Sequence, residues 1–341
     1  MRLNILYQSS DLYAPLTGIA MTSLFENNKD IVNIVVYLMD DGISEKNKSL
    51  LRKTATKYKR TLNFISTEII KSKLVDMGVA SFKGSYTTYY KLFVSKYIKD
   101  IENVNYLLYM DSDTLVDANI KDILSIDLRG KIAAARIDLV PDAYKTALEM
   151  DENLPYFNCG VILFNMYEWI QNRCEEQIVD SLINKRTKYS LADQDLLCTL
   201  FADKFAVLGL EYNFPSMLYI FSPKECYKVY DLKENTFYSI EEMEKAYAAP
   251  KIQHTLTHFG KRPWHENSGH PQEKFFFKYA KISEWNNYQR KDDKRSVIFA
   301  LQEIAYRICP KQIYIILHKE MLKMYLNKRD ANYKKKRNNC E

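Results

Sequence analysis

Two aspartates stand directly behind an apolar run near the first third of the chain. Asp111 and Asp113, with Ser112 between them, follow Tyr106–Met110, whose letters YLLYM are typical of a buried strand. Two carboxylates at one strand end can reach a common divalent cation, and their hard oxygen atoms suit Mg²⁺ or Mn²⁺. The alternative is a plain turn or helix cap, because aspartate favours both. The spacing alone leaves the metal site a hypothesis.

Two further segments point to the same chemistry. Pro155–Asn165 reads PYFNCGVILFN, in which Gly160 either lets a ligand approach the backbone closely or simply opens a strand. His258–Trp264 reads HFGKRPW and gathers an imidazole, a glycine and two cations. An imidazole can complete a Mn²⁺ shell begun by carboxylates, while Lys261 and Arg262 complement a diphosphate. The combination favours a site for a metal and a phosphorylated ligand.

In this order, the motifs resemble those of the retaining glycosyltransferases of family 8, which have the GT-A fold. The resemblance covers roughly residues 3–270. It rests on seven segments: NILYQSSDLYA at the start, TTYYKL at 87–92, YMDSD at 109–113, ARIDL at 135–139, YFNCGVILFN at 156–165, ADQDLL at 192–197 and HFGKRPWH at 258–265. The relatives it suggests are bacterial galactosyl- and glucosyltransferases that build lipopolysaccharide and other surface glycans.

The resemblance implies a UDP-hexose donor, Mn²⁺ as cofactor with Mg²⁺ as the alternative, and a surface-glycan or lipid-linked acceptor. It identifies Asp111, Asp113 and His258 as metal ligands, which would stabilise UDP as it leaves. Gln194 matches the side chain facing the anomeric carbon and Asp193 the one bonding sugar hydroxyls, so these two are the expected catalytic residues. The implied donor-binding residues are Tyr7, Gln8, Ser10, Asp11, Lys91, Asp111, Ser112, Asp138, Asn158, Cys159, Gly260, Lys261 and Arg262.

The chain departs from the family pattern in three places. Ser10 stands where the family often has Asp, so Asp11 or backbone groups are the alternatives for recognising uracil. Lys91 stands where Arg is common, which keeps the charge but loses the bidentate fork. The His-Phe-Gly loop is two residues shorter than the family's, which leaves open whether Lys261 or Arg262 meets the diphosphate.

Strands and helices alternate along the chain. Apolar or β-branched runs predict strands at Leu3–Tyr7, Ile31–Met39, Leu62–Ser66, Tyr106–Met110, Ile132–Ile137, Gly160–Asn165, Ala206–Leu208 and Lys251–Thr257. Helical spacing predicts helices at Pro15–Phe25, Ser44–Lys59, Thr87–Ile98, Ala143–Met150, Met166–Leu182, after Asp193, and at Val297–Leu326. This alternation predicts an α/β fold with a mostly parallel sheet, as the Rossmann-like GT-A fold implies. Ligands should then bind beyond the strand ends after Tyr7, Met39 and Met110.

Composition and charge limit the classes of function. Hydrophobic residues make up 47% and charged residues 27% of the 341, which excludes a disordered or fibrous chain. Residues 319–341 carry eight Lys and Arg against three Asp and Glu, a net +5, so the total of +6 leaves +1 for the remainder and disfavours nucleic acid as a partner. No secretion signal or membrane-spanning run is evident, so we expect a cytoplasmic protein with free thiols. Nothing in the sequence indicates an oligomeric state.

The C-terminal segment allows two hypotheses. After Pro310, an apolar stripe follows helical spacing at Ile313, Ile316, Leu317, Met321 and Met324. Either this stripe packs on the catalytic domain, or it docks with its neighbouring lysines on anionic lipid at the inner face of the cell membrane. We expect a catalytic domain at residues 1–280 and, at residues 281–341, a helical basic extension that associates peripherally with the membrane.

Other functions are weaker. A sugar-nucleotide nucleotidyltransferase needs a basic Gly-rich loop after the first strand, and Gln8–Asp11 has neither feature. A non-catalytic scaffold with a membrane-binding tail would have no need for the metal and catalytic residues. A zinc protease is excluded because His265 and His270 are five residues apart around a helix-breaking glycine. His254 and His318 are expected to be structural or surface residues.

Overall fold

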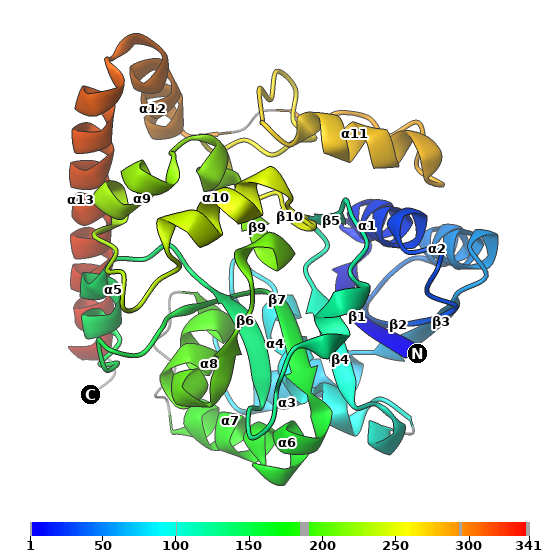
Figure 1. The fold of residues 1–341 in the computed structure, drawn as a ribbon. Coiled ribbons are helices and arrows are strands. Elements are labelled where there is room, and N and C mark those ends of the chain that lie inside the picture. Colours follow the sequence, from blue (N-terminus) through cyan, green and yellow to red (C-terminus); the bar gives the residue numbers. More distant parts are fainter. Residues whose placement is uncertain (1, 100, 185–190, 293–294, 339–341) are drawn as a thin grey trace.

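A seven-stranded sheet with the strand order β3-β2-β1-β4-β7-β6-β8 forms the centre of the computed structural model, which describes residues 2–99, 101–184, 191–292 and 295–338 (Figure 1). The strands of this sheet are β1 (Arg2–Ser10), β2 (Asn33–Asp41), β3 (Thr61–Ser66), β4 (Tyr106–Met110), β6 (Ala133–Ile137), β7 (Phe157–Asn165) and β8 (Phe205–Val207). Each predicted strand of the sheet is present, and β1 and β7 begin earlier than expected.

The sheet is parallel except for β7. Strand β1 pairs in parallel with β2 and β4, β2 with β3, and β6 with β8, whereas β7 is antiparallel to both β4 and β6. Because β7 runs in reverse, its first residues lie at the edge where β1 and β4 end. The α/β class with a mostly parallel sheet is therefore confirmed, and the reversed strand brings the Asn-Cys-Gly segment beside the two aspartates.

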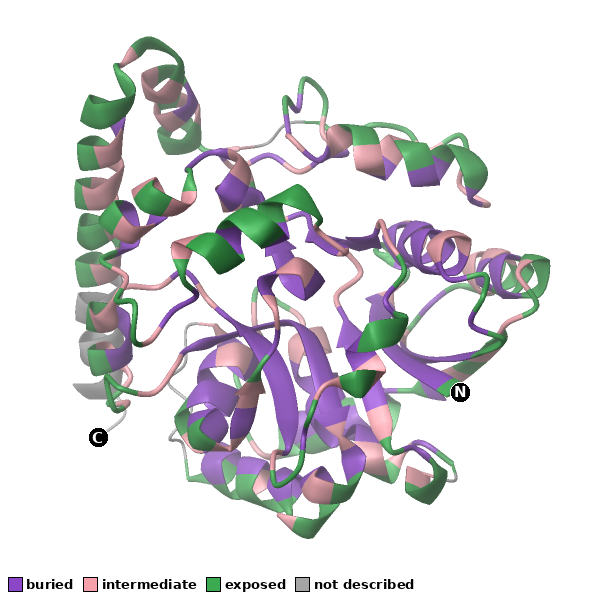
Figure 2. Ribbon diagram, in the orientation of Figure 1, coloured by how far each residue is buried: buried purple, intermediate pink, exposed green. Residues whose placement is uncertain are grey.

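Helices cover both faces of the sheet (Figures 1 and 2). On one face, α1 (Ala14–Asn27) and α2 (Glu45–Lys57) pack on side chains such as Ile5 and Val36. On the other, α3 (Glu68–Asp76), α4 (Thr87–Tyr90), α6 (Met166–Gln171), α7 (Cys174–Ile183) and α8 (Ala192–Phe201) pack on side chains such as Leu6 and Tyr109. Alternate strand residues thus enter opposite cores, as the period of two requires.

A second, smaller sheet lies at the carboxyl edge of the first. It has the order β5-β10-β9, with β5 (Thr114–Val116), β10 (Ile252–His254) and β9 (Phe214–Pro215). Strand β10 runs antiparallel to β5, and its last residue, His254, is paired with Thr114. The predicted strand Lys251–Thr257 is therefore shorter, and it ends beside the residues that follow β4.

Three of the predicted helices are interrupted. The expected helix Thr87–Ile98 forms the single turn α4 followed by a 3-10 helix at Lys91–Lys96. The expected helix Met166–Leu182 is divided into α6 and α7 by Arg173, whose φ of 51° is left-handed. The C-terminal stretch forms α12 (Val297–Ile308) and α13 (Lys311–Asn338), separated at Pro310, which cannot continue a helix. The remaining helices are α5 (Asp142–Ala147), α9 (Pro223–Tyr230), α10 (Ile240–Ala248) and α11 (Glu273–Ile282).

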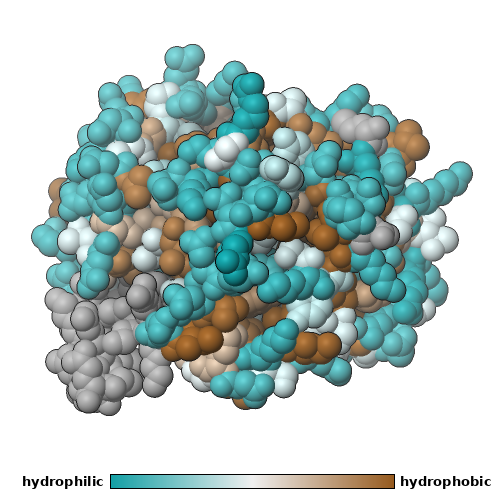
Figure 3. Space-filling model, turned by 90° about the horizontal axis from the view of Figure 1, so that it is seen from below, coloured by the Kyte–Doolittle hydropathy of each residue, from teal (hydrophilic) through white to brown (hydrophobic). Residues whose placement is uncertain are grey.

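Helix α13 runs along one side of the molecule, at the left of Figure 1. It is held there by the buried Tyr314, whose ring stacks on Phe221 with 6.0 Å between centroids. Ile313, Ile316 and Met324 are at least 50% exposed, so the predicted stripe faces away from the body. On the face shown in Figure 3, hydrophobic side chains lie in small groups separated by hydrophilic ones. Within the described ranges, no helix is both long and apolar enough to cross a membrane.

Candidate active site

Three potential metal ligands converge where the two sheets meet. Asp111 and Asp113 follow β4, and His254 ends β10. The Nε2 atom of His254 lies 3.3 Å from Oδ1 of Asp113 and 3.8 Å from Oδ2 of Asp111. One ligand atom from each residue lies within 4.8 Å of the others. Two carboxylates and one imidazole at this spacing fit a divalent cation of the Mn²⁺ type.

Gly160 makes room for this cluster. A Cβ atom at this position would lie 2.2 Å from Cε1 of His254 and 3.0 Å from Oδ2 of Asp111. The backbone nitrogen of Asp111 donates to the carbonyl of Gly160 at 2.8 Å, which fixes the turn after β4. The glycine predicted to allow a close approach therefore allows the approach of the histidine ring and not only of a ligand.

Positive charges flank the aspartate pair. Nη1 of Arg262 donates to Oδ2 of Asp113 at 2.6 Å. Burial alone would raise the pKa of Asp113, but Arg262 and His254 outweigh it and hold that pKa well below the ordinary value. Burial does raise the pKa of Asp111, against the charge of Lys91. Asp113 is therefore ionised at neutral pH.

Lys91 and Asp193 form a buried ion pair beside the aspartates. Their Nζ and Oδ2 atoms are 2.6 Å apart, and Nζ also donates to the carbonyl of Cys159 at 3.1 Å. Burial raises the pKa of Asp193 to about 6, even against Lys91. The pKa of Lys91 is raised as well, because Asp193 and Asp111 outweigh the effect of burial. Both groups are thus ionised at neutral pH.

Polar side chains on β7 and α8 form one hydrogen-bonded network. Nε2 of Gln194 donates to Oδ2 of Asp138 at 3.1 Å, and its Oε1 accepts from the backbone nitrogen of Cys159 at 3.1 Å. Nδ2 of Asn158 donates to the same Asp138 oxygen at 3.1 Å. A bulge between Ala135 and Arg136 shifts the pairing of β6 with β7 and sets Arg136 opposite Asn158. The network fixes the orientation of the Gln194 amide.

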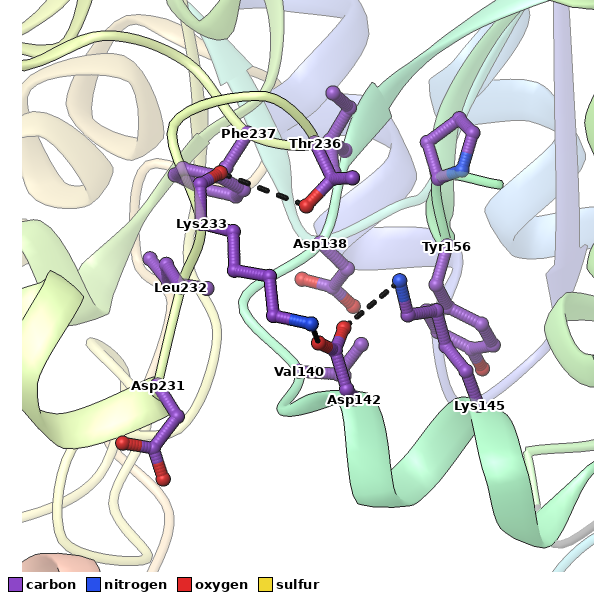
Figure 4. A pocket seen from close by; sticks show the side chains of 12 residues that line it. Asp138, Val140, Asp142, Lys145, Tyr156, Asp231, Leu232, Lys233, Thr236 and Phe237 are labelled. Carbon is purple, nitrogen blue, oxygen red and sulfur yellow. Dashed lines mark hydrogen bonds and ion pairs between the residues drawn. The ribbon is translucent and has the colours of Figure 1, made fainter. Parts of the chain in front are cut away.

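A pocket opens on the far side of Asp138 (Figure 4). Tyr156, the start of α5 and the segment 231–237 line it. Within it, Asp142 pairs with Nζ of Lys145 at 2.9 Å and with Nζ of Lys233 at 2.5 Å, and both lysines point toward it in Figure 4. The loop between Asp138 and Pro155 thus forms a wall of the pocket next to the Gln194 network.

Comparison with known proteins gives the site its context. The sequence profile of Glycosyl transferase family 8 matches residues 4–268, which include every residue described above. The chain belongs to this family.

The chain is similar to several proteins with known names or structures. A candidate glycosyltransferase of Haemophilus influenzae is 30% identical over 220 residues, 62% of this chain and 63% of that protein, so less than two thirds of that relative is spanned. The lipopolysaccharide 1,2-glucosyltransferase of Escherichia coli K12 is 26% identical over 306 residues, 87% of this chain and 83% of that one. The galactosyltransferase LgtC, solved with donor and acceptor sugar analogs, superposes with a TM-score of 0.67 at 22% identity over 84% of this chain and all of that one. The last comparison confirms the GT-A fold.

The structure places His254, and not the His258 expected from the family 8 motif, beside the two aspartates. The motif assigns His258, not His254, to the metal. His258 lies four residues beyond the end of β10, in a loop where its ring centroid is 5.6 Å from that of His270. Burial lowers the pKa of His258 to about 4, and its Nδ1 atom has no hydrogen-bond partner among the residues that the structure describes. Strand pairing carries His254, which we expected to be a structural or surface residue, to the two aspartates.

The two cations of this loop, Lys261 and Arg262, make different contacts. Nζ of Lys261 is buried, donates to the carbonyl of Asn267 at 2.6 Å and lies 3.5 Å from a carboxylate oxygen of Glu303 on α12. Arg262 turns the other way, toward Asp113. Gly260 has a φ of 77°, and a Cβ there would lie 2.7 Å from the ring of Phe299. Gly260 and Lys261 thus hold the loop against α12, whereas Arg262 is the cation of this loop that contacts Asp113.

The first strand reaches the site through its backbone and alternate side chains. Gln8 donates to the hydroxyl of Tyr109 at 2.7 Å, and its carbonyl accepts from Oγ of Ser112 at 3.0 Å. The side chain of Tyr7, which was expected to bind the donor, is fully buried in the core under α1 and α2. Asp11 is tied to the start of α2, where it accepts from the backbone nitrogen of Ser44 at 2.8 Å. Ser10, half-buried at the end of β1, has no such engagement of its side chain among the described contacts.

Sequence reasoning missed four residues that build the site. Tyr109 donates to Asp111, and Arg136 pairs with Asp138 at 2.9 Å. The hydroxyl of Tyr156 accepts from Nε2 of Gln194 at 3.2 Å. Asn213 contacts His254 at 2.9 Å. Tyr109, Arg136 and Tyr156 stand within motifs that the family resemblance quoted, so their position was a usable signal, whereas Asn213 lies in a segment with no predicted element.

Proposed function

We propose that this family 8 chain is a metal-dependent, retaining hexosyltransferase. It moves galactose or glucose from a UDP-sugar to a surface-glycan or lipid-linked acceptor. The observation that carries the proposal is the cluster of Asp111, Asp113 and His254 at the strand edge, directly beside the network of Gln194 and Asp138. One part suits a metal-held diphosphate and the other a sugar, at the place where open α/β sheets bind ligands.

The charges of the site support an anionic donor that arrives with a cation. Three carboxylates, Asp111, Asp113 and Asp193, face two cations, Lys91 and Arg262. A divalent ion changes this balance from net negative to net positive, which then attracts a diphosphate. When bound, such an ion supplies Lewis-acid stabilisation of the charge on the departing UDP. The imidazole ligand favours Mn²⁺ over Mg²⁺.

The protein's own groups orient the reacting sugar. Asp138 and Asn158 present hydrogen-bonding atoms next to Gln194, whose amide is held at both ends. Gln194 is a weak nucleophile, and the network offers no free carboxylate base for inversion, so we expect net retention of the anomeric configuration. Asp193, paired with Lys91, supplies acceptor oxygens for the sugar hydroxyls. The loop between Asp138 and Pro155, which borders this network, is the proposed acceptor side.

The test is hydrolysis of a panel of nucleotide sugars with EDTA, Mn²⁺ or Mg²⁺. We expect turnover of UDP-galactose or UDP-glucose that EDTA abolishes and Mn²⁺ restores, with an α-anomeric product by NMR. Asp113→Asn should reduce turnover at least about 100-fold, because a charge contact to the leaving group is lost. Asp117→Asn is the matched control, since Asp117 pairs with Lys278 at 2.8 Å beyond the far end of β5.

Four outcomes would contradict the proposal. Full activity in EDTA would contradict the metal dependence, and an inverted product would contradict the retaining mechanism. Formation of a UDP-sugar from UTP and a hexose 1-phosphate would instead identify the nucleotidyltransferase. Absence of turnover with every donor, together with vesicle binding, would leave the non-catalytic scaffold.

A lipid-linked acceptor would lie in a membrane, and the exposed apolar face of the C-terminal helices is suited to bind one. On α12, an apolar stripe at helical spacing is between 51% and 75% exposed; its members are Val297, Leu301, Ile304 and Ile308. On α13, Ile316 and Met324 continue the exposed apolar surface, and Lys323 and Lys328 are exposed nearby. We therefore keep the division into a catalytic domain at 1–280 and a membrane-associated extension at 281–341 as part of the proposal.

Point variants test the membrane association better than truncation. Removing α12 would also remove Glu303, which pairs with Lys261 in the loop of the site. Ile304→Asn combined with Ile308→Asn should lower co-sedimentation with anionic vesicles at least about tenfold, because each buried apolar side chain contributes about 1.5–3 kcal/mol. Val32→Asn, at an 86% exposed position elsewhere, is the control. Equal binding of wild type and double variant would contradict the membrane role of this surface.

A further inference from the structure

A chain of amides connects the sugar side of the site to His254. Asp138 lies at one end, Asn158 and Asn213 follow, and His254 lies at the other end. Nδ2 of Asn158 donates to Oδ2 of Asp138 at 3.1 Å, Nδ2 of Asn213 donates to Oδ1 of Asn158 at 2.9 Å, and Nδ1 of His254 lies 2.9 Å from Oδ1 of Asn213. All three side chains between Asp138 and the aspartate pair are buried.

The direction of every hydrogen bond in this chain is determined. Oδ1 of Asp138 accepts from Arg136 and from the backbone nitrogen of Leu139. The charge of Arg136 outweighs burial and holds the pKa of Asp138 below its ordinary value, so Oδ2 is unprotonated and can only accept from Asn158. The backbone nitrogen of Gly160 can only donate, and it reaches Oδ1 of Asn158 at 3.2 Å. Asn158 is therefore fixed by an acceptor at one end and a donor at the other, and reversing its amide would break both contacts.

This polarity passes through Asn213 to the imidazole. Because Oδ1 of Asn158 accepts, the neighbouring atom of Asn213 must be its NH₂ group, and the Asn213 oxygen must face His254. That oxygen can only accept, so Nδ1 of His254 carries a proton. In the neutral ring, the lone pair is then on Nε2, the atom that faces Asp111 and Asp113.

We propose that Asn213 is a positioning residue that selects the metal-binding tautomer of His254. The inference rests on the proposed metal-dependent function but concerns a residue outside the metal shell. Without Asn213, the neutral ring gains more by protonating Nε2 and donating to Asp113, and that tautomer has no lone pair for a metal. Partners that orient a ligand histidine commonly change metal affinity by about 10–100-fold.

The first experiment measures the tautomer directly in the metal-free wild-type protein. Long-range ¹H–¹⁵N spectra at a pH near 8.5, where an ordinary imidazole is neutral, identify the protonated nitrogen. The His254 signals are assigned with His254→Gln. We expect protonation on Nδ1. Protonation on Nε2 would overturn the inference, and this result is independent of whether the protein turns over any donor.

The second experiment compares Mn²⁺ affinity by electron paramagnetic resonance. Asn213→Leu should weaken binding about 10–100-fold, and Asn213→Asp, which still accepts from Nδ1, should restore affinity to near the wild-type value. Asn28→Leu is the matched control, because Asn28 is also fully buried, donates to the carbonyl of Leu24 at 2.9 Å and accepts from the backbone nitrogen of Ile120 at 2.9 Å.

The outcomes separate positioning from general stability. The control should lower the melting temperature and leave Mn²⁺ affinity unchanged. Unchanged affinity in Asn213→Leu, or an equal loss in Asn28→Leu, would overturn the role of Asn213. If Asn213→Leu does not fold, the wild-type tautomer and the affinity of Asn213→Asp decide. Wild-type protein that binds no Mn²⁺ but protonates Nδ1 would contradict the proposed metal function and support the tautomer selection.

Discussion

Gly160→Ala is the sharpest test of how the metal cluster is built. The added Cβ would stand 2.2 Å from Cε1 and 2.8 Å from Nδ1 of His254. Non-bonded carbon atoms are ordinarily about 3.5–4.0 Å apart, so the ring must retreat by more than about 1 Å. Its Nδ1 contact to Asn213 is already 2.9 Å long, and a movement of that size breaks it.

Two consequences follow with different magnitudes. Metal sites tolerate displacements of about 0.2 Å, so we expect Mn²⁺ affinity to fall at least about tenfold, which corresponds to about 1.4 kcal/mol. Overpacking a filled site costs about 1–3 kcal/mol of folding free energy. Mn²⁺ titration followed by electron paramagnetic resonance measures the first effect, and urea unfolding of the metal-free protein measures the second.

Gly18→Ala is the control for overpacking alone. Its Cβ would lie 1.8 Å from Cζ3 of Trp285, on the side of α1 that faces this indole. We expect a similar loss of stability with unchanged Mn²⁺ affinity. Wild-type affinity in Gly160→Ala would refute the reasoning, because the ring could then reach the metal from another position.

Three further predictions concern charge. Burial lowers the pKa of His270 to about 3 and that of His318 to about 4. Between a pH of about 6.5 and these values, only the unfolded chain binds the two protons, so the folding stability should decrease as the pH is lowered. His270→Gln should reduce this slope by up to about 1.4 kcal/mol per pH unit in urea titrations. Lys91→Met should cost about 3–5 kcal/mol in the same assay by leaving a buried carboxylate unpaired, and adding Asp193→Asn should recover most of it. Lys233→Glu should change acceptor use in transfer assays while donor hydrolysis stays at the wild-type rate, because Lys233 pairs with Asp142 in the loop proposed as the acceptor side.

Local pattern was sufficient for the strands of the sheet and for two of the three residues of the candidate metal cluster. The apolar run that forms β4 and the two aspartates that follow it are neighbours in sequence. Their relative position can therefore be predicted without knowledge of the fold. His254 was misjudged because its role depends on pairing between β10 and β5, more than 130 residues apart in the chain. The sequence near His254 does not indicate that strand register, whereas His258 lies in a loop with two cations that the sequence makes evident.

The other omissions have the same cause. Asn213 precedes β9, a strand of two residues that has no periodicity to detect. Whether Lys261 or Arg262 faces the site depends on Glu303, which reaches the loop from α12. On α13, helical spacing revealed an apolar stripe but not its direction. The side that packs is instead the one with Tyr314 and His318, whose rings meet Phe221.

The reversed direction of β7 explains why one segment serves both halves of the site. A parallel β7 would place its first residues at the opposite edge of the sheet, away from the ends of β1 and β4. Because β7 runs in the reverse direction, Asn158 lies beside Asp138 and Gln194. Gly160, only two residues further along, lies beside Asp111 and His254. Asn158 then bonds to the sugar-side network through its nitrogen and to Asn213 through its oxygen. A displacement of this segment must therefore disturb both the proposed donor-sugar contacts and the metal ligand, and neither half of the site can be repositioned without the other.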